Sequence, residues 1–141
     1  MTTLHNAHID VADVSKVFNP GERAVVALQN IDLHIPDGQF VCLLGPSGCG
    51  KSTLLNAIAG FALPSSGAIT AGGKLVTGPG PERGMVFQEY ALFPWMTVEK
   101  NIGFGLEIKG VPKAEIKTRV DALQAMLSLS DFRNRFPKDL S

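Results

Sequence analysis

The chain has no long hydrophobic run. Its purely apolar stretches, such as Phe40–Leu44, are far shorter than the roughly 20 residues that a membrane-spanning helix needs. The N-terminal residues also lack the basic start and the continuous apolar stretch of a secretory signal. We therefore expect a chain that does not cross a bilayer and that stays in the cytoplasm.

Neither sign of charge is in excess, and cysteine is scarce. Lys plus Arg and Asp plus Glu number 13 each, so the formal net charge is zero; this argues against a general polyanion binder and predicts no nucleic-acid partner. Only Cys42 and Cys49 are present, and in a reducing compartment we expect both to be free. With 45% hydrophobic and 18% charged residues, the chain has the composition of a folded domain.

Apolar patterns predict several strands. Residues alternate in Ile9–Val14 and Val25–Ile35, which is typical of antiparallel strands with one solvated face. Phe40–Leu44 is apolar at every position, which predicts a central parallel strand buried on both faces. Three more short strands are expected, at Ala68–Thr70, Lys74–Val76 and Met85–Phe87.

Helical patterns follow the glycine-rich loop and fill the last third of the chain. Ser52–Ala59 suits a helix that Gly60 can end. From Thr97 onward the sequence is helical in character, and behind Pro112 four apolar residues recur at helical spacing: Ile116, Val120, Leu123 and Leu127. The sequence thus predicts an α/β core followed by helices.

The loop Gly45–Ser52 is the strongest chemical signal. Gly45, four residues, then Gly50, Lys51 and Ser52 match the phosphate-binding loop, in which backbone N–H groups and a helix N-terminus face phosphate oxygens. Lys51 is expected to reach the β- and γ-phosphates, and the Ser52 hydroxyl to coordinate Mg²⁺. The sequence therefore predicts ATP and Mg²⁺ as ligands.

A plain glycine turn between a strand and a helix is the alternative for this loop. We reject it because such a turn needs neither Lys51 nor the second glycine. Cys49 could be a redox site, but a small side chain that faces away from the phosphates is the preferred interpretation, and we assign it no chemistry.

Motifs along nearly the whole chain resemble the ATPase subunit of ABC transporters. In chain order they are Leu44–Leu55, Ala59-Gly60, Ser66-Gly67, Met85-Val86-Phe87-Gln88, Leu92-Phe93-Pro94-Trp95 and Val98. The resemblance implies a P-loop NTPase core of α/β fold with an antiparallel β edge and the start of a helical subdomain. Gly78–Gly84 and Phe93-Pro94-Trp95 are most similar to importers of nitrate, sulfonates and taurine.

The resemblance also implies the site residues. The Walker A segment would bind the nucleotide through Gly45, Pro46, Ser47, Gly48, Cys49, Gly50, Lys51, Ser52 and Thr53. Gln88 matches the Q-loop glutamine that touches Mg²⁺ and the attacking water, so Lys51 and Gln88 are expected in catalysis, and Ser52 and Gln88 at the metal. Phe18 matches an aromatic that stacks on adenine. The alternatives are a core phenylalanine for Phe18 and a solvated loop amide for Gln88.

Partners follow from the same resemblance. The segment Glu89–Val98 would receive the coupling helix of a membrane-spanning permease subunit. Trp95 is either a partner contact or an anchor between the helical subdomain and the core. A second ATPase subunit and, indirectly, a periplasmic or lipid-anchored solute-binding protein are further partners, with the chain on the inner face of the membrane. The three histidines are expected at the surface without metal-ligand company: His5, His8 and His34.

The expected organisation is an incomplete domain. Residues 1–88 form the nucleotide-binding core, and residues 89–141 form the Q-loop and a partial helical subdomain that ends where Leu140-Ser141 resembles the start of the signature motif. The Walker B strand and the water-polarising carboxylate have no match, and Glu89 does not replace that carboxylate. Two hypotheses remain: the N-terminal part of a transport ATPase that couples ATP binding and hydrolysis to solute uptake, or a truncated nucleotide-binding module without turnover. A P-loop kinase is disfavoured because nothing after Gln88 resembles an acceptor site.

Overall fold

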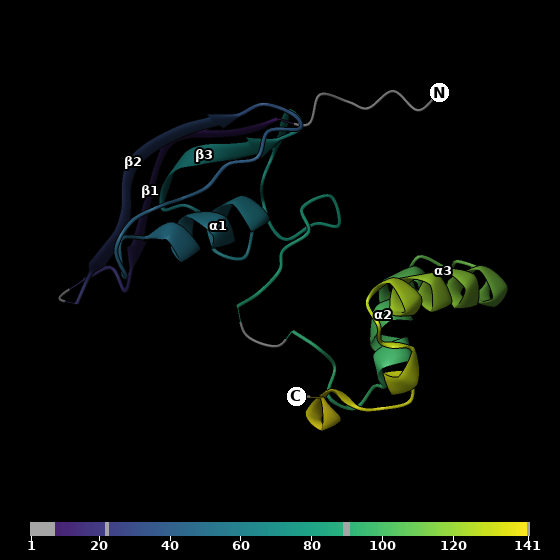
Figure 1. The fold of residues 1–141 in the computed structure, drawn as a ribbon. Coiled ribbons are helices and arrows are strands. Elements are labelled where there is room, and N and C mark those ends of the chain that lie inside the picture. The colour runs from purple at the N-terminus through teal and green to yellow at the C-terminus, as the bar shows by residue number, and fades with distance from the viewer. Residues whose placement is uncertain (1–7, 22, 89–90, 141) are drawn as a thin grey trace. The chain divides into compact units, whose positions relative to one another are not determined.

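The computed structural model describes residues 8–21, 23–88 and 91–140. They belong to two compact units, Met1–Met85 and Val86–Ser141 (Figure 1). Sequence analysis had set the boundary slightly later, between residues 88 and 89. As a consequence of this division, Gln88 belongs to the second unit.

The first unit carries an antiparallel sheet of order β2-β1-β3-β4. The strands are β1 (Ile9–Phe18), β2 (Val25–Ile35), β3 (Ser66–Ala71) and β4 (Lys74–Leu75). Every pairing is antiparallel, and β1 pairs with β2 from Ile9 opposite Ile35 to Phe18 opposite Val25. This confirms the antiparallel strands predicted from alternation.

Helix α1 (Lys51–Ala59) packs on this sheet (Figure 1). The buried residues that form the core come from both layers: Val11, Val14, Leu28, Leu54, Ala57, Ile69 and Val76. The helix ends at Gly60, as predicted, in a left-handed conformation with φ of 87°. A Cβ at Gly60 would lie 2.1 Å from the carbonyl oxygen of Gly78, so the cap also allows two backbone segments to meet closely.

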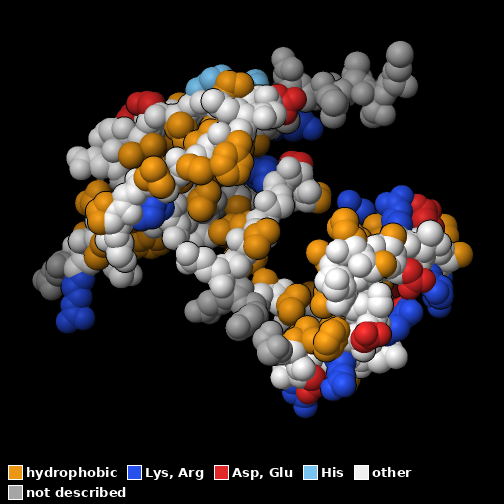
Figure 2. Space-filling model, viewed as in Figure 1, with side chains coloured by type: hydrophobic (Ala, Val, Ile, Leu, Met, Phe, Trp, Pro, Cys, Tyr) orange, Lys and Arg blue, Asp and Glu red, His pale blue; other side chains and the backbone are white. Residues whose placement is uncertain are grey.

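Two predicted strands are wrong for this structure. Phe40–Leu44 forms no strand, and Phe40 and Leu44 are 89% and 91% exposed. Met85–Phe87 forms no strand either, and Val86 is 96% exposed. A parallel strand needs neighbours that complete its hydrogen-bond ladder, and none of the described strands pairs with either segment. Hydrophobic side chains consequently remain on the surface of the first unit (Figure 2).

The second unit is helical, which confirms the change in character at Thr97. Helices α2 (Val98–Ile108) and α3 (Lys113–Met126) are followed by two single-turn 3₁₀ helices, η1 (Ser130–Phe132) and η2 (Pro137–Asp139). The two helices cross closely at Gly103, where an added Cβ would lie 3.2 Å from Ile116 Cγ2. Val120 is buried, whereas the predicted apolar stripe of α3 leaves Leu123 and Leu127 exposed.

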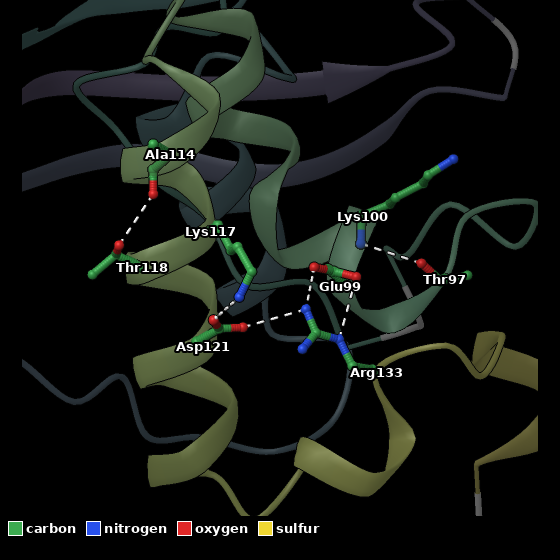
Figure 3. Close-up of polar contacts among 8 residues, drawn as sticks. All are labelled: Thr97, Glu99, Lys100, Ala114, Lys117, Thr118, Asp121 and Arg133. Carbon is green, nitrogen blue, oxygen red and sulfur yellow. Dashed lines mark hydrogen bonds and ion pairs between the residues drawn. The ribbon is translucent and has the colours of Figure 1, made fainter.

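An ion-pair network fastens the chain after α3 to both helices (Figure 3). The Arg133 guanidinium pairs with Glu99 of α2, and its Nη2 lies 3.3 Å from Asp121 Oδ1 of α3. Lys117 Nζ lies 2.6 Å from the other Asp121 oxygen. Hydrogen bonding from Lys117, with further attraction from Arg133, holds the pKa of Asp121 below its ordinary value. Glu99 correspondingly raises the pKa of Arg133.

Backbone bonds strengthen the same junction. The amides of Val98 and Glu99, at the start of α2, donate to the carbonyls of Arg135 and Arg133 at 2.9 and 3.0 Å. These amides have no partner within their own helix, so the returning chain satisfies them. Throughout the described part of the chain, no helix is both long enough and apolar enough to span a membrane.

Candidate nucleotide-binding site

The glycine loop lies immediately before α1 and is fixed against the sheet at Gly50. Gly50 adopts φ of 94°, and a Cβ there would lie 2.5 Å from the Ala27 carbonyl oxygen and 3.0 Å from Leu28 Cδ2. Both neighbours belong to β2, and Leu28 is part of the core. The second glycine of the motif is therefore required by close packing as well as by its backbone conformation.

The N-terminus of α1 is open to an anion. No side chain caps it, and its first turn contains no acidic residue. The first helical hydrogen bond runs from the Leu54 amide to the Gly50 carbonyl at 2.9 Å. The preceding amides of a helix point along its axis, and the helix dipole makes that end positive. The arrangement suits phosphate oxygens.

Lys51 places its charge on the loop itself. Its Nζ donates to the carbonyl oxygens of Gly45 at 2.8 Å and Pro46 at 2.7 Å. The carbonyls hold the ammonium group beside the turn Pro46–Gly50 rather than leaving it extended into solvent. A positive charge thus lies next to the open helix end.

Cys49 also contacts this ammonium group. Its Sγ lies 3.4 Å from Lys51 Nζ, and a Cβ at Gly45 would come within 2.8 Å of the sulfur. Cys42 and Cys49 are both free thiols, as expected. The thiol occupies the space next to Gly45 where a side chain would otherwise lie. That Cys49 faces away from the phosphates stays a prediction.

The oxygen donors near the loop fit a Mg²⁺ ion that is bound together with a nucleotide. They do not form a metal site made of protein side chains alone. Ser52 is exposed in the first turn of α1, and Thr53 beside it is half-buried. Among residues 8–21, 23–88 and 91–140, no group of three or more His, Cys, Asp or Glu side chains could hold a metal ion. Magnesium in phosphate sites keeps several waters and uses few protein ligands beside the phosphates, so one hydroxyl is a sufficient contribution.

Phe18 lies at the end of β1 in the same unit as the loop. The ring is 40% exposed, and Lys16 Nζ lies 5.2 Å from its centroid. Strand β2 connects the two features, because it pairs with Phe18 at Val25 and contacts Gly50 through Ala27. A half-exposed aromatic at this position is available for stacking.

Gln88 is exposed in a segment without regular structure. It belongs to the second unit, whereas Lys51 and Ser52 belong to the first. Gln88 is therefore described separately from the loop, and its catalytic and metal-binding roles stay predictions.

The predicted partner-binding segment is described from Ala91 onward; Glu89 lies outside the described residues. Asn101 of α2, which sequence analysis missed, organises this segment. Its Oδ1 accepts from the Phe93 amide at 2.8 Å, and its Nδ2 lies within 3.1 Å of three carbonyl oxygens, those of Phe93, Met96 and Thr97. Asparagine is a weak helix former because its side chain tends to bond to nearby backbone groups. Its presence in the first turn of a predicted helix was the sequence signal that could have identified this role.

Trp95 is presented on this organised turn. Its side chain is 70% exposed, and its ring lies 5.6 Å from that of Phe93, which in turn lies 4.5 Å from that of Phe104. The Phe93 ring is therefore fixed between a helix residue and Trp95. An exposed aromatic on a fixed turn suits contact with another protein.

Two of the histidines form a small cluster instead of being isolated. His8 Nε2 lies 2.9 Å from Asp10 Oδ2, and His34 Nδ1 contacts the other oxygen of the same carboxylate. The hydrogen bond with His34 lowers the pKa of Asp10. His5 lies outside the described residues.

The loop, the open helix and the placement of Lys51 and Ser52 define the P-loop class of nucleotide-binding proteins. Within this class the chain belongs to the ABC transporter family, whose family model, described as "ABC transporter", matches residues 28–141. This confirms the resemblance noted in the sequence.

Relatives and solved structures agree with this family. The chain is 47% identical over 134 residues to the nitrate import ATP-binding protein NrtD of Synechocystis sp., covering 95% of this chain and 50% of the relative. It is 47% identical over 122 residues to the taurine import ATP-binding protein TauB of Roseobacter denitrificans, covering 86% and 46%. The chain thus spans about half the length of the curated relatives it matches.

Among solved structures, the fold is similar to an ATP-binding cassette determined as a dimer in a post-hydrolysis state with ADP and Pi. The TM-score is 0.82 at 30% identity, covering 94% of this chain and 63% of the other. The fold is accordingly the antiparallel β edge, Walker helix and helical subdomain of an ABC ATPase.

Proposed function

We propose that this chain is the ATP-binding component of an ABC-type importer, in which binding and hydrolysis of Mg-ATP are coupled to solute uptake. The observation that carries the proposal is the Lys51 ammonium group on the loop carbonyls beside an uncapped helix N-terminus. Lys51 would neutralise the phosphates, the loop amides would orient them, and Ser52 would hold Mg²⁺. Phe18 would stack on the adenine.

The proposed setting is the inner face of a membrane. The exposed Trp95 on the turn fixed by Asn101 supports a docking role for Glu89–Val98 toward a membrane-spanning permease subunit. A second ATPase subunit would complete the site, and a solute-binding protein would act indirectly.

A second candidate is a nucleotide-binding module that binds Mg-ATP without turning it over. It is favoured because the water-polarising carboxylate of the family pattern has no match in these 141 residues. Hydrolysis requires a group that orients and activates water, and a cationic loop alone cannot supply one.

Titration with a fluorescent ATP analogue tests the shared core of both candidates. Lys51→Ala removes a charge-assisted contact worth about 1.5–3 kcal/mol, so the dissociation constant should rise at least about tenfold. Lys74→Ala, an exposed lysine of the same unit, removes the same charge outside the loop and serves as the control. An unchanged dissociation constant for Lys51→Ala would contradict the proposed site.

A further inference from the structure

The end of β1 carries a cation on one face of the Phe18 ring. Lys16 Nζ lies 5.2 Å from the ring centroid, within the range of a cation–π interaction. The two residues are separated by one position, so their side chains leave the strand on the same side. The same Nζ donates to the Leu63 carbonyl oxygen at 2.6 Å, which ties the ammonium group to the segment that follows α1.

This contact belongs to a wider connection between β1 and the segment that follows α1. The Ser65 amide donates to the Ser15 carbonyl at 2.8 Å, and Ser65 Oγ accepts from the Val17 amide at 3.0 Å. Helix α1 ends only a few residues earlier, at Ala59. Hydrogen bonds thus connect the strand that carries the Phe18 ring to the segment that directly follows α1.

A ring held in this way is prepared for stacking. An exposed phenylalanine changes rotamer on a picosecond to nanosecond timescale, and binding must then stop that motion. A cation attracted to one face restricts the ring before a ligand arrives, and the ordering cost of binding falls. Phe18 is 40% exposed, so part of its surface can still contact a flat base.

We propose that Lys16 is a positioning residue that orients Phe18 for adenine, a role that rests on the proposed adenine contact of Phe18. Each lysine then affects a different part of the nucleotide. Lys51 contacts the phosphates, whereas Lys16 affects only the base, through the Phe18 ring.

The test compares dissociation constants for ATP and for inorganic triphosphate. The 141-residue chain is measured beside Lys16→Met, Lys16→Arg, Phe18→Ala and the Lys16→Met/Phe18→Ala double variant. Lys16→Met keeps most of the stem and removes the charge, so ATP should bind about two- to fivefold more weakly while triphosphate binding is unchanged. Lys16→Arg should restore ATP binding. Adding Lys16→Met to Phe18→Ala should produce no further loss, because the ring through which Lys16 acts is gone.

Each contrary result points to a different error. A selective loss of ATP in Phe18→Ala, with none in Lys16→Met, would overturn the positioning role and leave the adenine contact standing. Equal losses of ATP and triphosphate in Lys16→Met, or no rescue by Lys16→Arg, would show that Lys16 acts on the phosphates or through packing. If Phe18→Ala itself is not selective for ATP, the proposed adenine contact is wrong, and the role of Lys16 is wrong with it.

Discussion

Gly50 and Lys51 are neighbours whose identities have different physical causes. The space at Gly50 admits no Cβ, because a β2 carbonyl oxygen and a core leucine methyl group already occupy it. Lys51 is required for its charge, which the loop carbonyls hold in place. The glycine therefore contributes to the stability of the first unit, whereas the lysine contributes to the proposed nucleotide binding.

Gly50→Ala should lower the stability of the first unit. The substitution creates a contact of about 2.5 Å and places a side chain at a positive φ, so we expect a loss of at least about 1–3 kcal/mol in the free energy of unfolding. Chemical denaturation measures it. Gly84→Ala is the matched control, since a Cβ there meets nothing within 4 Å. Equal stability of the two variants would show that the loop moves freely away from β2.

A single side chain, Asn101, connects the first turn of α2 to the preceding turn, through the amide of Phe93 and the carbonyl of Thr97. Thr97 caps the helix by accepting a hydrogen bond from the Lys100 amide at 3.4 Å (Figure 3). The turn that carries Trp95 is therefore held by the helix, and the Trp95 ring also contacts the Phe93 ring.

Asn101→Ala should release this turn. Several hydrogen bonds are lost, and half-buried carbonyls lose their donor, so we expect a destabilisation of about 1–3 kcal/mol and a lower fluorescence anisotropy for Trp95. Trp95 is the only tryptophan of the chain, so its signal is unambiguous. Asn134→Ala, at an exposed position of the same unit, is the control. An unchanged anisotropy would mean that the ring contacts of Phe93 are sufficient to fix the turn.

Sequence patterns predicted the elements whose stability is local or whose partners are close in the chain. Strands β1 and β2 alternate and pair with each other, and α1 carries its own helix signals and a glycine cap. The strand predicted at Phe40–Leu44 is wrong because an apolar run indicates a buried segment but does not identify the neighbouring strands with which that segment would pair. Asn101 was missed because its importance lies in four hydrogen bonds that appear only when α2 and the preceding turn are folded together.

At the scale of the whole molecule, the proposed function gives the described loop one side of a phosphate clamp. Lys51, Ser52 and the loop amides are all cationic or hydrogen-bonding groups, and they stabilise ground state and transition state alike. In the family resemblance, the opposing groups belong to a second subunit and to motifs without a match in this sequence.

The 141-residue chain should consequently bind Mg-ATP and release no phosphate faster than its Lys51→Ala variant. Measuring phosphate release from both, beside a full-length relative such as the nitrate import protein, tests this. If the chain turns over ATP as fast as that relative and Lys51→Ala abolishes the activity, then a carboxylate within these residues is the base, and the assignment of Glu89 as non-catalytic is the first to be rejected.

The loop Gly45–Ser52 has regular secondary structure on one side only. Beyond Gly50 it continues into α1, whose Leu54 and Ala57 are buried in the core. Before Gly45 it is attached to Phe40–Leu44, of which Leu43 packs on the core but which pairs with no described strand. Any chain that completes a hydrogen-bond ladder along this segment restricts the loop from its free side. By thermodynamic linkage, any change that such pairing makes to the free energy of nucleotide binding is matched by an equal change that the nucleotide makes to the free energy of pairing.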